Sequence, residues 1–306
     1  MFKINRQASL RPSILSIGNF DGVHRGHQAI LSSLVAKAKR LGLQSQVLIF
    51  EPHPKEFFLG RVAPKRLQNL RAKVTCIRAL GVDAVVCCHF SAKVAALSPG
   101  AFIKEILKQK LQTEALVLGE DFRFGHQRQG KIATLMAAGL KVETVPAVAY
   151  QGRRISSTWV RELILGNHFE LAEQLMQHPY MLSGHVVHGA KHGRLLGYPT
   201  INLNLTRNMA VHGVYAVRVR LLGRWYDGVA NVGHRPALNP TKMPLLEVYL
   251  FNYQAECYGA LAEVFFVRKL REELKFANLE ALKTQIGEDA QLAQKILQGE
   301  PSRCKN

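Results

Sequence analysis

The 306-residue sequence lacks an apolar run near the roughly 20 residues that a membrane span needs. Its basic N-terminal stretch, MFKINRQASLRPS, also lacks the apolar segment of a signal peptide. The 5 cysteines are an odd number without CxxC spacing, which argues against a disulfide framework and a cysteine-based zinc site. We therefore expect a cytoplasmic protein, not bound to membranes, in which Cys76, Cys87, Cys88, Cys257 and Cys304 are free thiols.

Acidic residues are also scarce. The chain has 22 Asp and Glu against 41 Lys and Arg, a formal net charge of +19. This excess indicates an anionic partner, and charge alone does not choose between nucleic acid, an acidic membrane surface and a polyphosphate substrate. The composition, 47% hydrophobic and 21% charged, is typical of a globular protein. At this length we expect two domains of roughly 120 to 180 residues each.

The first half of the chain alternates apolar strands with helical patterns. Strands are predicted at 13–20, 46–50, 84–88 and 115–118, and helices at 28–41, 69–80 and 99–110. This alternation favours an α/β domain with an open parallel sheet. Ligands of such sheets bind outside the carboxyl ends of the strands, so we expect a site at the loop after Phe20.

From about Leu182 the pattern changes to short runs rich in Val, Tyr and Leu, broken by Gly, Pro and Asn. These runs predict an antiparallel β domain, a small barrel. A terminal helix is predicted at 279–297 behind an Asn278 cap, and we expect it to pack on the barrel. Its apolar residues recur at threes and fours: Leu279, Leu282, Ile286, Ala290, Ala293 and Leu297.

Familiar phosphate-binding signatures are missing. The sequence has no complete GxxxxGK[ST] loop and no GxGxxG. The stretch GHQRQGKI at 125–132 imitates the first but lacks its final Ser or Thr and the preceding strand, so we set it aside.

A first candidate site lies in GNFDGVHRGH, residues 18–27, between a predicted strand and helix. The two glycines before the helix, Gly18 and Gly22, allow a polyphosphate to approach the backbone, and the opening helix offers unpaired N–H groups and a positive dipole end. His24 and His27, three residues apart, can face one phosphate and stabilise the charge that develops when the α-phosphate of ATP is attacked.

The stretch RISSTWVREL adds Ser156, Ser157 and Thr158 at a helix start, with Arg161 a turn further on to grip leaving phosphates. Two alternatives stay open at this point. The serines can be an ordinary N-cap, and the two histidines can be surface residues or zinc ligands, although no third ligand is spaced nearby.

A second candidate site lies in GHVVHGAKHGRLLGYPTINL, where Gly189 and Lys191 belong to a loop that can cradle phosphates. Thr200 and Asn202, two apart, share one side of an extended chain, as two oxygen ligands of a nucleotide-bound Mg²⁺ require. Glu247, in an apolar strand, is the candidate base for a hydroxyl nucleophile. The alternatives are a simple turn and a solvent-facing Glu on an edge strand.

Residues 13–181 resemble the adenylyltransferase half of bacterial bifunctional riboflavin kinase/FAD synthetases. The matching stretches are SIGNFDGVHRGH, FEPHP, LRAK, LGVD, LGEDFRFGHQRQG and RISSTWVR. The resemblance implies a Rossmann-like HxGH nucleotidyltransferase domain. It also implies that ATP and Mg²⁺ are held by residues of the first site, and that FMN is bound by residues of FEPHP and DFRFG. The implied ATP-binding residues are Gly18, Asn19, Phe20, Asp21, Gly22, His24, His27, Ser157, Thr158 and Arg161, and the flavin-binding residues are Pro52, Pro54, Asp121 and Phe124.

Residues 182–297 resemble the riboflavin kinase half of the same family. The matching stretches are GHVVHGAKHGRLLGYPTINL, GVYAV, GVANVGHRP, EVYLFNY, YG and LREELKF. The resemblance implies a six-stranded barrel with Mg-ATP at Thr200 and Asn202, Glu247 as the base for the riboflavin 5′-hydroxyl, and Arg271 closing the flavin pocket. The chain departs from the family at Tyr249, Asn252 and Ala237, which leaves details of the flavin loop open.

We thus expect an adenylyltransferase domain at 1–181 and a riboflavin kinase domain at 182–306, with riboflavin, FMN and ATP as substrates. One alternative is an adenylyltransferase for another phosphate acceptor, such as a nicotinamide or pantetheine phosphate. The other is a basic nucleic-acid-binding protein. The sequence shows no aromatic-and-basic recognition face, so we expect no nucleic-acid partner. It does not predict the oligomeric state.

Overall fold

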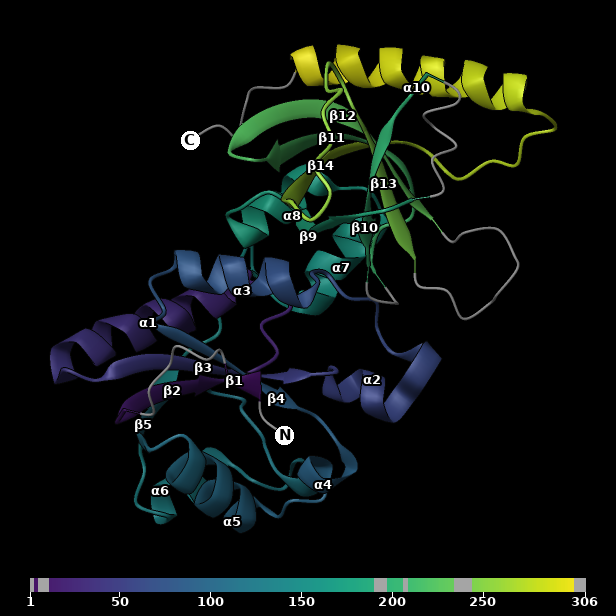
Figure 1. Ribbon diagram of the computed structural model, residues 1–306. Helices are drawn as coiled ribbons and strands as arrows, with labels where there is room; N and C mark the ends of the chain where they lie inside the picture. Colours follow the sequence, from purple (N-terminus) through teal and green to yellow (C-terminus); the bar gives the residue numbers. More distant parts are fainter. Residues whose placement is uncertain (1–2, 5–10, 190–196, 206–208, 234–243, 300–306) are drawn as a thin grey trace. The chain divides into compact units, whose positions relative to one another are not determined.

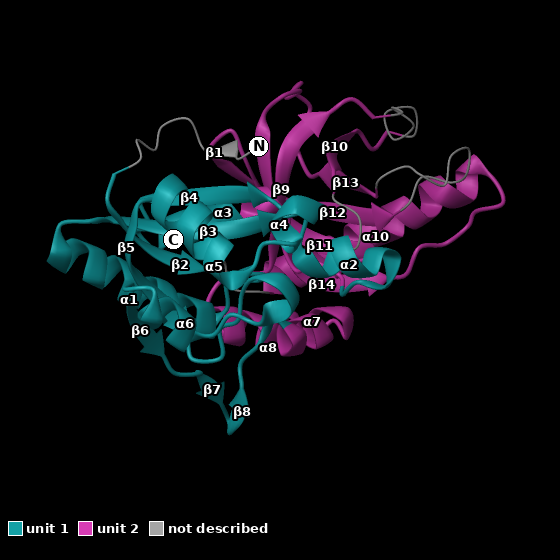
Figure 2. Ribbon diagram, turned by 90° about the horizontal axis from the view of Figure 1, so that it is seen from below, with its two compact units in different colours: residues 1–64, 73–157 teal, residues 65–72, 158–306 magenta. Residues whose placement is uncertain are grey.

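The computed structural model describes residues 3–4, 11–189, 197–205, 209–233 and 244–299. The chain divides into two compact units, coloured separately in Figure 2. Unit 1 comprises Met1–Pro64 and Lys73–Ser157, and unit 2 comprises Lys65–Ala72 and Thr158–Asn306. The segment 65–72 therefore belongs with the C-terminal part of the chain, which no sequence pattern indicated. The domain boundary at 181/182 stays a prediction.

Unit 1 contains the predicted parallel sheet, with strand order β1-β4-β3-β2-β5-β6 (Figure 1). Only the short β1 runs antiparallel to its neighbour, β4. The order turns back between β2 and β5, which is the switch point where ligands of such sheets bind. The strands are β1 (Lys3–Ile4), β2 (Ser13–Ile17), β3 (Gln44–Glu51), β4 (Ala84–His89), β5 (Thr113–Gly119) and β6 (Lys141–Val145), with a separate hairpin of β7 (Ala149–Tyr150) and β8 (Arg153–Arg154).

The helix α1 covers one face of this sheet, and α5 and α6 lie on the other (Figure 1). The helices and turns of this half are α1 (Arg25–Leu41), α2 (Pro54–Leu59), η1 (Gly60–Val62), α3 (Leu70–Ala79), α4 (Ala92–Ala95), α5 (Pro99–Ala101), η2 (Phe102–Lys110), η3 (His126–Arg128) and α6 (Ile132–Ala137). The helix predicted at 99–110 is thus a short α-helical turn followed by a π-helical segment. The predicted helix at 28–41 begins three residues earlier, at Arg25.

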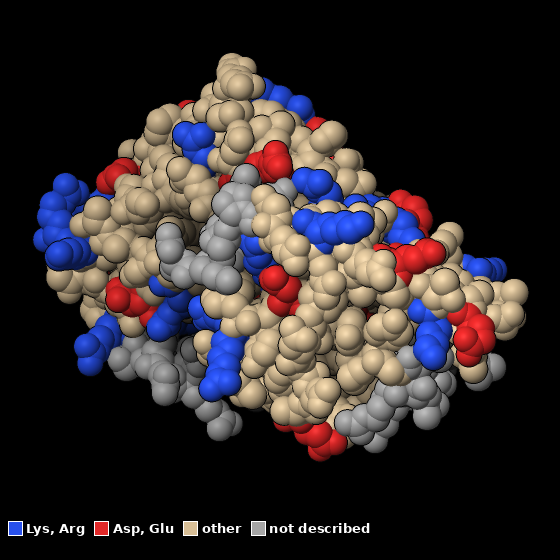
Figure 3. Space-filling view, turned by 90° about the horizontal axis from the view of Figure 1, so that it is seen from above, with Lys and Arg blue, Asp and Glu red and all other residues tan. Residues whose placement is uncertain are grey.

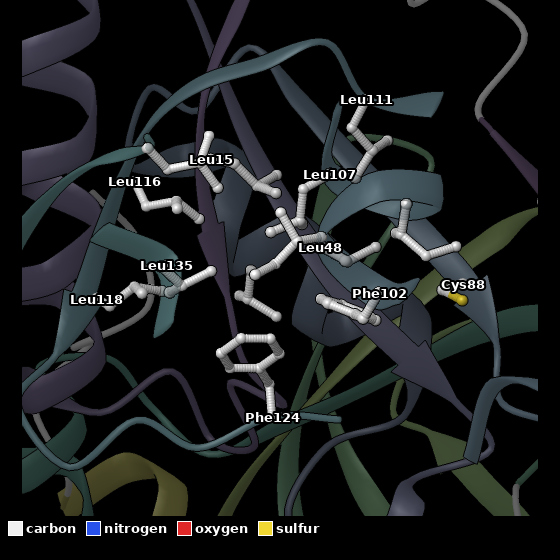
Figure 4. Packing of buried hydrophobic residues seen from close by; sticks show 14 of the residues in the cluster. Leu15, Leu48, Cys88, Phe102, Leu107, Leu111, Leu116, Leu118, Phe124 and Leu135 are labelled. Carbon is white, nitrogen blue, oxygen red and sulfur yellow. The ribbon is translucent and has the colours of Figure 1, made fainter. Parts of the chain in front are cut away.

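The main core of unit 1 fills the space between the sheet and the helical layer of η2 and α6 (Figure 4). Leu15 and Leu48 reach it from β2 and β3, and Leu107 and Leu135 from the helical side, all four with no exposed surface. Strands buried on both faces read as continuous apolar runs, which is why sequence alone located them.

Unit 2 contains the closed six-stranded antiparallel barrel, with strand order β10-β13-β12-β11-β14-β9 and a final pairing of β9 with β10. Its strands are β9 (Met181–Val187), β10 (Thr200–Asn204), β11 (Gly213–Leu221), β12 (Arg224–Gly233), β13 (Leu245–Leu250) and β14 (Leu261–Arg271). Along β13 the side chains alternate: Leu246 and Val248 point into the barrel with no exposure, whereas Glu247 points outward.

Three further helices belong to this half: α7 (Ser157–Leu165), α8 (Phe169–Met176) and α10 (Leu279–Gly299). The predicted cap of α10 is confirmed, because Asn278 Oδ1 accepts a hydrogen bond from the Ala281 amide at 2.9 Å. The predicted packing is confirmed too, because Ala293 and Leu297 join Val214 and Val229 of the barrel in one apolar cluster. Leu279 does not contribute to this stripe, since it is 64% exposed at the first helical turn.

Among the described residues, no helix combines the length and the apolar character that crossing a membrane demands. The described cysteines, at 76, 87, 88 and 257, are free thiols as predicted, and Cys304 lies outside the described residues. Burial raises the pKa of the Cys88 thiol to about 11, which keeps it protonated and unreactive at neutral pH. On the face in view in Figure 3, Lys and Arg are scattered with Asp and Glu between them.

Replacing Leu48 by Ala tests the core of unit 1. The residue has no exposed surface, so we expect Leu48→Ala to lower the free energy of unfolding by about 2–5 kcal/mol, measured by denaturant titration. The control is Leu41→Ala, at a leucine that is 49% exposed, which we expect to change stability by less than about 1 kcal/mol. Equal losses in both variants would contradict the assignment of this core.

Candidate active sites

The loop between β2 and α1 shapes the first site. Phe20 and Val23 have φ angles of 47° and 38°, which are in the left-handed region and turn the chain sharply before the helix. A Cβ on Gly18 would lie 2.9 Å from the Phe20 ring, so a side chain at position 18 would require that ring to move. Asp21 is 4% exposed, and the buried Asn19 Oδ1 accepts no hydrogen bond from the described residues.

Helix α1 begins just after His24, so the two histidines lie at the N-cap and in the first turn. Their rings stack with centroids 3.7 Å apart and planes at 19°. Burial, then the charges of His24 and Lys73, hold the pKa of His27 well below its usual range. A neutral imidazole donates only one N–H, and the buried Nδ1 of His27 has no partner among the described residues.

A cavity of about 450 Å³ opens beside these histidines at the carboxyl ends of β2, β5 and β6. It is lined by Gly18, Phe20, His24 and His27, and also by Asp121 and Ser157. The Ser157 hydroxyl donates a 2.8 Å hydrogen bond to the Asp21 carbonyl, so Ser157, the last residue of unit 1, is held against the loop after β2. The cavity thus lies at the switch point of the sheet, where the strand pattern predicted a site.

The structure also brings in residues that sequence reasoning missed. Arg154 and Phe122 line the same cavity, and Arg154 Nη2 lies 2.7 Å from Asp121 Oδ2. Arg154 stands directly before the Ile-Ser-Ser-Thr stretch in the sequence, but no residue pattern marked it as different from neighbouring arginines. Its position is set by the β7–β8 hairpin, which the apolar patterns did not reveal.

Other predicted residues of this site lie elsewhere in their units. Phe124 is 6% exposed within the main core, with its ring centroid 5.6 Å from that of Phe102. Pro52 follows a cis peptide bond at the end of β3, and Pro54 is the first residue of α2. Thr158 and Arg161 belong to unit 2, where Arg161 Nε donates a hydrogen bond to the Lys65 carbonyl. Their parts in ligand binding stay predictions.

The second site rests on the register of the barrel strands. Asn202 of β10 is the direct partner of Glu247 of β13, and Glu247 is the direct partner of Asn231 of β12. Direct partners share a face of the sheet, with Cβ atoms about 4.5–5.5 Å apart. The same row continues through Val214 of β11 to Arg271 of β14. Four polar residues from distant parts of the sequence therefore lie in one row on the outer face of the barrel.

A small pocket of about 60 Å³ adjoins this row and is lined by Gly189, Thr200 and Asn202 together with residues 253–258. Asn202 is 5% exposed, and its Oδ1 is buried without a hydrogen-bond partner among the described residues. A Cβ on Gly189 would overlap the Asn202 side chain, so any larger residue there would displace the Asn202 amide. Lys191 and Ala237 lie outside the described residues.

Arg271 makes an ion pair that the sequence did not predict. Its guanidinium forms hydrogen bonds from Nε at 3.0 Å and from Nη2 at 2.7 Å to the carboxylate of Asp289 on α10. Asp289 is 5% exposed, so the pair joins the end of β14 to the covering helix in a largely buried place. The predicted flavin contact of Arg271 stays a prediction.

No group of three or more His, Cys, Asp or Glu side chains within the described ranges could hold a metal ion. The zinc alternative for His24 and His27 therefore has no ligand set in the part of the chain that the structure describes. Asn and Thr oxygens, which suit Mg²⁺, remain as the candidate donors at the second site.

The two units define a Rossmann-like nucleotide-binding fold followed by a six-stranded barrel. Models of two families match the chain: FAD synthetase at residues 6–159 and riboflavin kinase at residues 176–297. The bifunctional riboflavin kinase/FMN adenylyltransferase of Haemophilus influenzae is 43% identical over 295 residues, which cover 94% of this chain and 96% of that protein. The Escherichia coli K12 enzyme of the same name is 41% identical and covers 92% of each chain.

A crystal structure described as a macrolide-efflux protein from Streptococcus pneumoniae is similar over 98% of both chains, with a TM-score of 0.73 and 26% sequence identity. The chain belongs to the bifunctional riboflavin kinase/FMN adenylyltransferase family.

The lowered pKa of His27 predicts a pH dependence of stability. Below the unfolded pKa of about 6.5, the unfolded chain binds a proton that folded His27 does not, so stability falls as the pH falls toward the folded pKa. We expect His27→Gln to remove this contribution. The free energy of unfolding of the native chain should fall more steeply from pH 7 to pH 5.5 than that of the variant. Parallel pH profiles would contradict the assignment.

Proposed function

We propose that the chain makes FAD from riboflavin in two ATP-dependent steps. The barrel transfers the γ-phosphoryl group of ATP to riboflavin, giving FMN and ADP, and the Rossmann-like unit then joins FMN to the adenylyl group of a second ATP, releasing pyrophosphate. The family membership supports both reactions and their order along the chain. The observation that carries the residue assignments is the row in which Asn202, Glu247 and Asn231 are direct cross-strand partners.

In the kinase step, Glu247 is the base. Its carboxylate takes the proton of the riboflavin 5′-hydroxyl while that oxygen bonds to the γ-phosphorus, and the bond to the β-phosphate oxygen breaks to release ADP. The position of Glu247 supports this role: it lies next to Asn202, which lines the pocket with Gly189 and Thr200. ATP, the phosphate donor, and the riboflavin 5′-hydroxyl, the acceptor, then both lie beside the Glu247 carboxylate.

Thr200 and Asn202 fit a magnesium ion bound to the nucleotide. The buried, unpartnered Asn202 Oδ1 is an oxygen ligand of the kind that Mg²⁺ prefers, and the close approach of Gly189 leaves the loop backbone beside it. When bound, the ion neutralises charge on the phosphates. The chain itself orients the nucleotide through Gly189 and presents the amide oxygen of Asn202.

In the adenylyl transfer step, an oxygen of the FMN phosphate attacks the α-phosphorus of ATP, and pyrophosphate leaves. His24 and His27 at the start of α1 donate hydrogen bonds to the phosphate oxygens on which charge develops. Their place beside the cavity and the helix N-terminus supports this role.

The direct test is to incubate the purified chain with riboflavin, ATP and Mg²⁺ and to separate riboflavin, FMN and FAD by chromatography over time. We expect FMN to appear first and FAD after it. FMN alone would mean that the first unit serves another phosphate acceptor. The absence of any flavin product would contradict the proposed function.

Two substitutions should separate the activities. We expect Glu247→Gln to abolish FMN formation while FAD formation from supplied FMN continues, because the amide cannot accept the proton. We expect His27→Ala to slow FAD formation by about 100-fold or more while FMN still accumulates. Initial rates of both steps, measured for each variant, provide the internal control. An unchanged kinase rate in Glu247→Gln would exclude Glu247 as the base.

Asn202 should control the magnesium requirement of the kinase. We expect Asn202→Ala to raise the Mg²⁺ concentration that gives half-maximal FMN formation by about tenfold, because an oxygen ligand is lost. Asn204→Ala is the matched control, since Asn204 lies two residues along the same strand and is exposed. A shift of equal size in the control would contradict the assignment.

Cytoplasmic location and independence from nucleic acid stay predictions from the sequence. In this proposal the excess of Lys and Arg over Asp and Glu suits the substrates, because ATP and FMN carry phosphate groups and riboflavin gains one.

A further inference from the structure

Asn231 has no role in the two proposed reactions, yet it adjoins Glu247, the candidate base. It lies on β12 as the direct partner of Glu247 on one side and of Val214 on the other. Val214 belongs to the apolar cluster beneath α10, so Asn231 faces the strip of outer surface between Glu247 and the covering helix. The nucleotide pocket at Asn202 is on the opposite side of Glu247, so this strip is the acceptor side of the row.

The orientation of the Asn231 amide is determined by its neighbour. Nδ2 lies 3.3 Å from Oε1 of Glu273, and a carboxylate only accepts hydrogen bonds, so the NH₂ group must face Glu273. Oδ1 consequently faces away from Glu273. This oxygen is buried and accepts no hydrogen bond from any residue that the structure describes.

Glu273 is itself held in place. Its Oε2 lies 3.0 Å from Nε2 of His212, in the turn before β11. Its Oε1 packs against the backbone of Gly233, where any Cβ would overlap the carboxylate. His212 and Gly233 thus hold the Glu273 carboxylate in place, and this carboxylate in turn orients the Asn231 amide. The buried acceptor oxygen of Asn231, Oδ1, therefore points away from Glu273 and the residues that hold it.

We propose that Asn231 is a specificity-determining residue of the kinase, whose Oδ1 accepts a hydrogen bond from a hydroxyl of the acceptor's polyol chain. The proposal rests on the proposed function, because Glu247 marks where the reacting hydroxyl lies. Adjacent strands are about 4.8 Å apart, so Asn231 reaches the chain next to that hydroxyl. Glu273 is a positioning residue that keeps the amide oxygen, and not the NH₂ group, toward the substrate.

Removing the acceptor tests the proposal. We expect Asn231→Ala to raise the KM for riboflavin about tenfold, the usual loss for one hydrogen bond in a binding site, while the KM for ATP stays within twofold. Lumiflavin, which has the flavin ring but no polyol chain, is the probe that separates ring contacts from chain contacts. Its inhibition constant against riboflavin should be unchanged in Asn231→Ala. An unchanged riboflavin KM, or an equal weakening of lumiflavin, would overturn the proposal.

The positioning role is tested by a reciprocal exchange. Asn231→Asp places two carboxylates together and should raise the riboflavin KM. Adding Glu273→Gln places an amide NH₂ group, a donor, against the carboxylate now at position 231, an acceptor. The other oxygen of that carboxylate is then available to the substrate. The double variant should therefore recover most of the riboflavin affinity. A double variant no better than Asn231→Asp would overturn the proposal, and it decides the matter if Asn231→Ala is inactive.

Glu272→Gln is the control for Glu273, because Glu272 is the adjacent carboxylate, is 70% exposed, and pairs with Lys269 at 2.5 Å while it lies 3.8 Å from His212 Nδ1 and makes no hydrogen bond with Asn231. It should leave the riboflavin KM unchanged. If the native chain forms no FMN at all, the proposed function itself is wrong. That result differs from one in which the native chain forms FMN and Asn231→Ala leaves the KM for riboflavin unchanged, which would overturn only the role of Asn231.

Discussion

The alternation of side chains along paired strands is the constraint on which the barrel site depends. Closing six strands sends Leu246 and Val248 inward, and the same register sends Glu247 outward between Asn202 and Asn231. A slip of one residue in β13 would bury the carboxylate and expose Leu246 and Val248. The apolar filling of the barrel therefore fixes the position of the polar row, and with it which residues flank Glu247 on each side.

The first unit meets a different constraint, the reversal of strand order at β2 and β5. The reversal opens a cavity at the carboxyl ends of the strands, and the loop after β2 must then turn within a few residues to begin α1 at Arg25. The left-handed residues Phe20 and Val23 make that turn and bring the two histidines to the helix start. Burial of His27, which lowers its pKa, follows from the same compact loop.

Sequence patterns predicted the elements whose burial is continuous or periodic. Four of the parallel strands, β2 to β5, together with the barrel and the capped terminal helix α10, could be predicted from apolar spacing, since each must bury a defined face. The parallel strand β6 was not predicted, because its residues are only partly buried or exposed. Family motifs predicted Glu247 and the Thr200–Asn202 pair as site residues, and the strand register places Glu247 between Asn202 and Asn231. The row itself could not be predicted, because pairing of β10, β13 and β12 joins residues far apart in sequence. The sequence did not predict Arg154 or the Arg271–Asp289 pair for the same reason, because only tertiary contacts distinguish these charged residues from the many others in the chain.

The most direct test of two sites acting in succession is the fate of labelled phosphate. The chain is supplied with riboflavin and with ATP labelled at either the γ- or the α-phosphorus, and FMN and FAD are separated and counted. The account predicts that γ-label enters FMN and remains in FAD, and that α-label enters FAD but never FMN. FAD that lacks the γ-label, or FMN that carries the α-label, would contradict it.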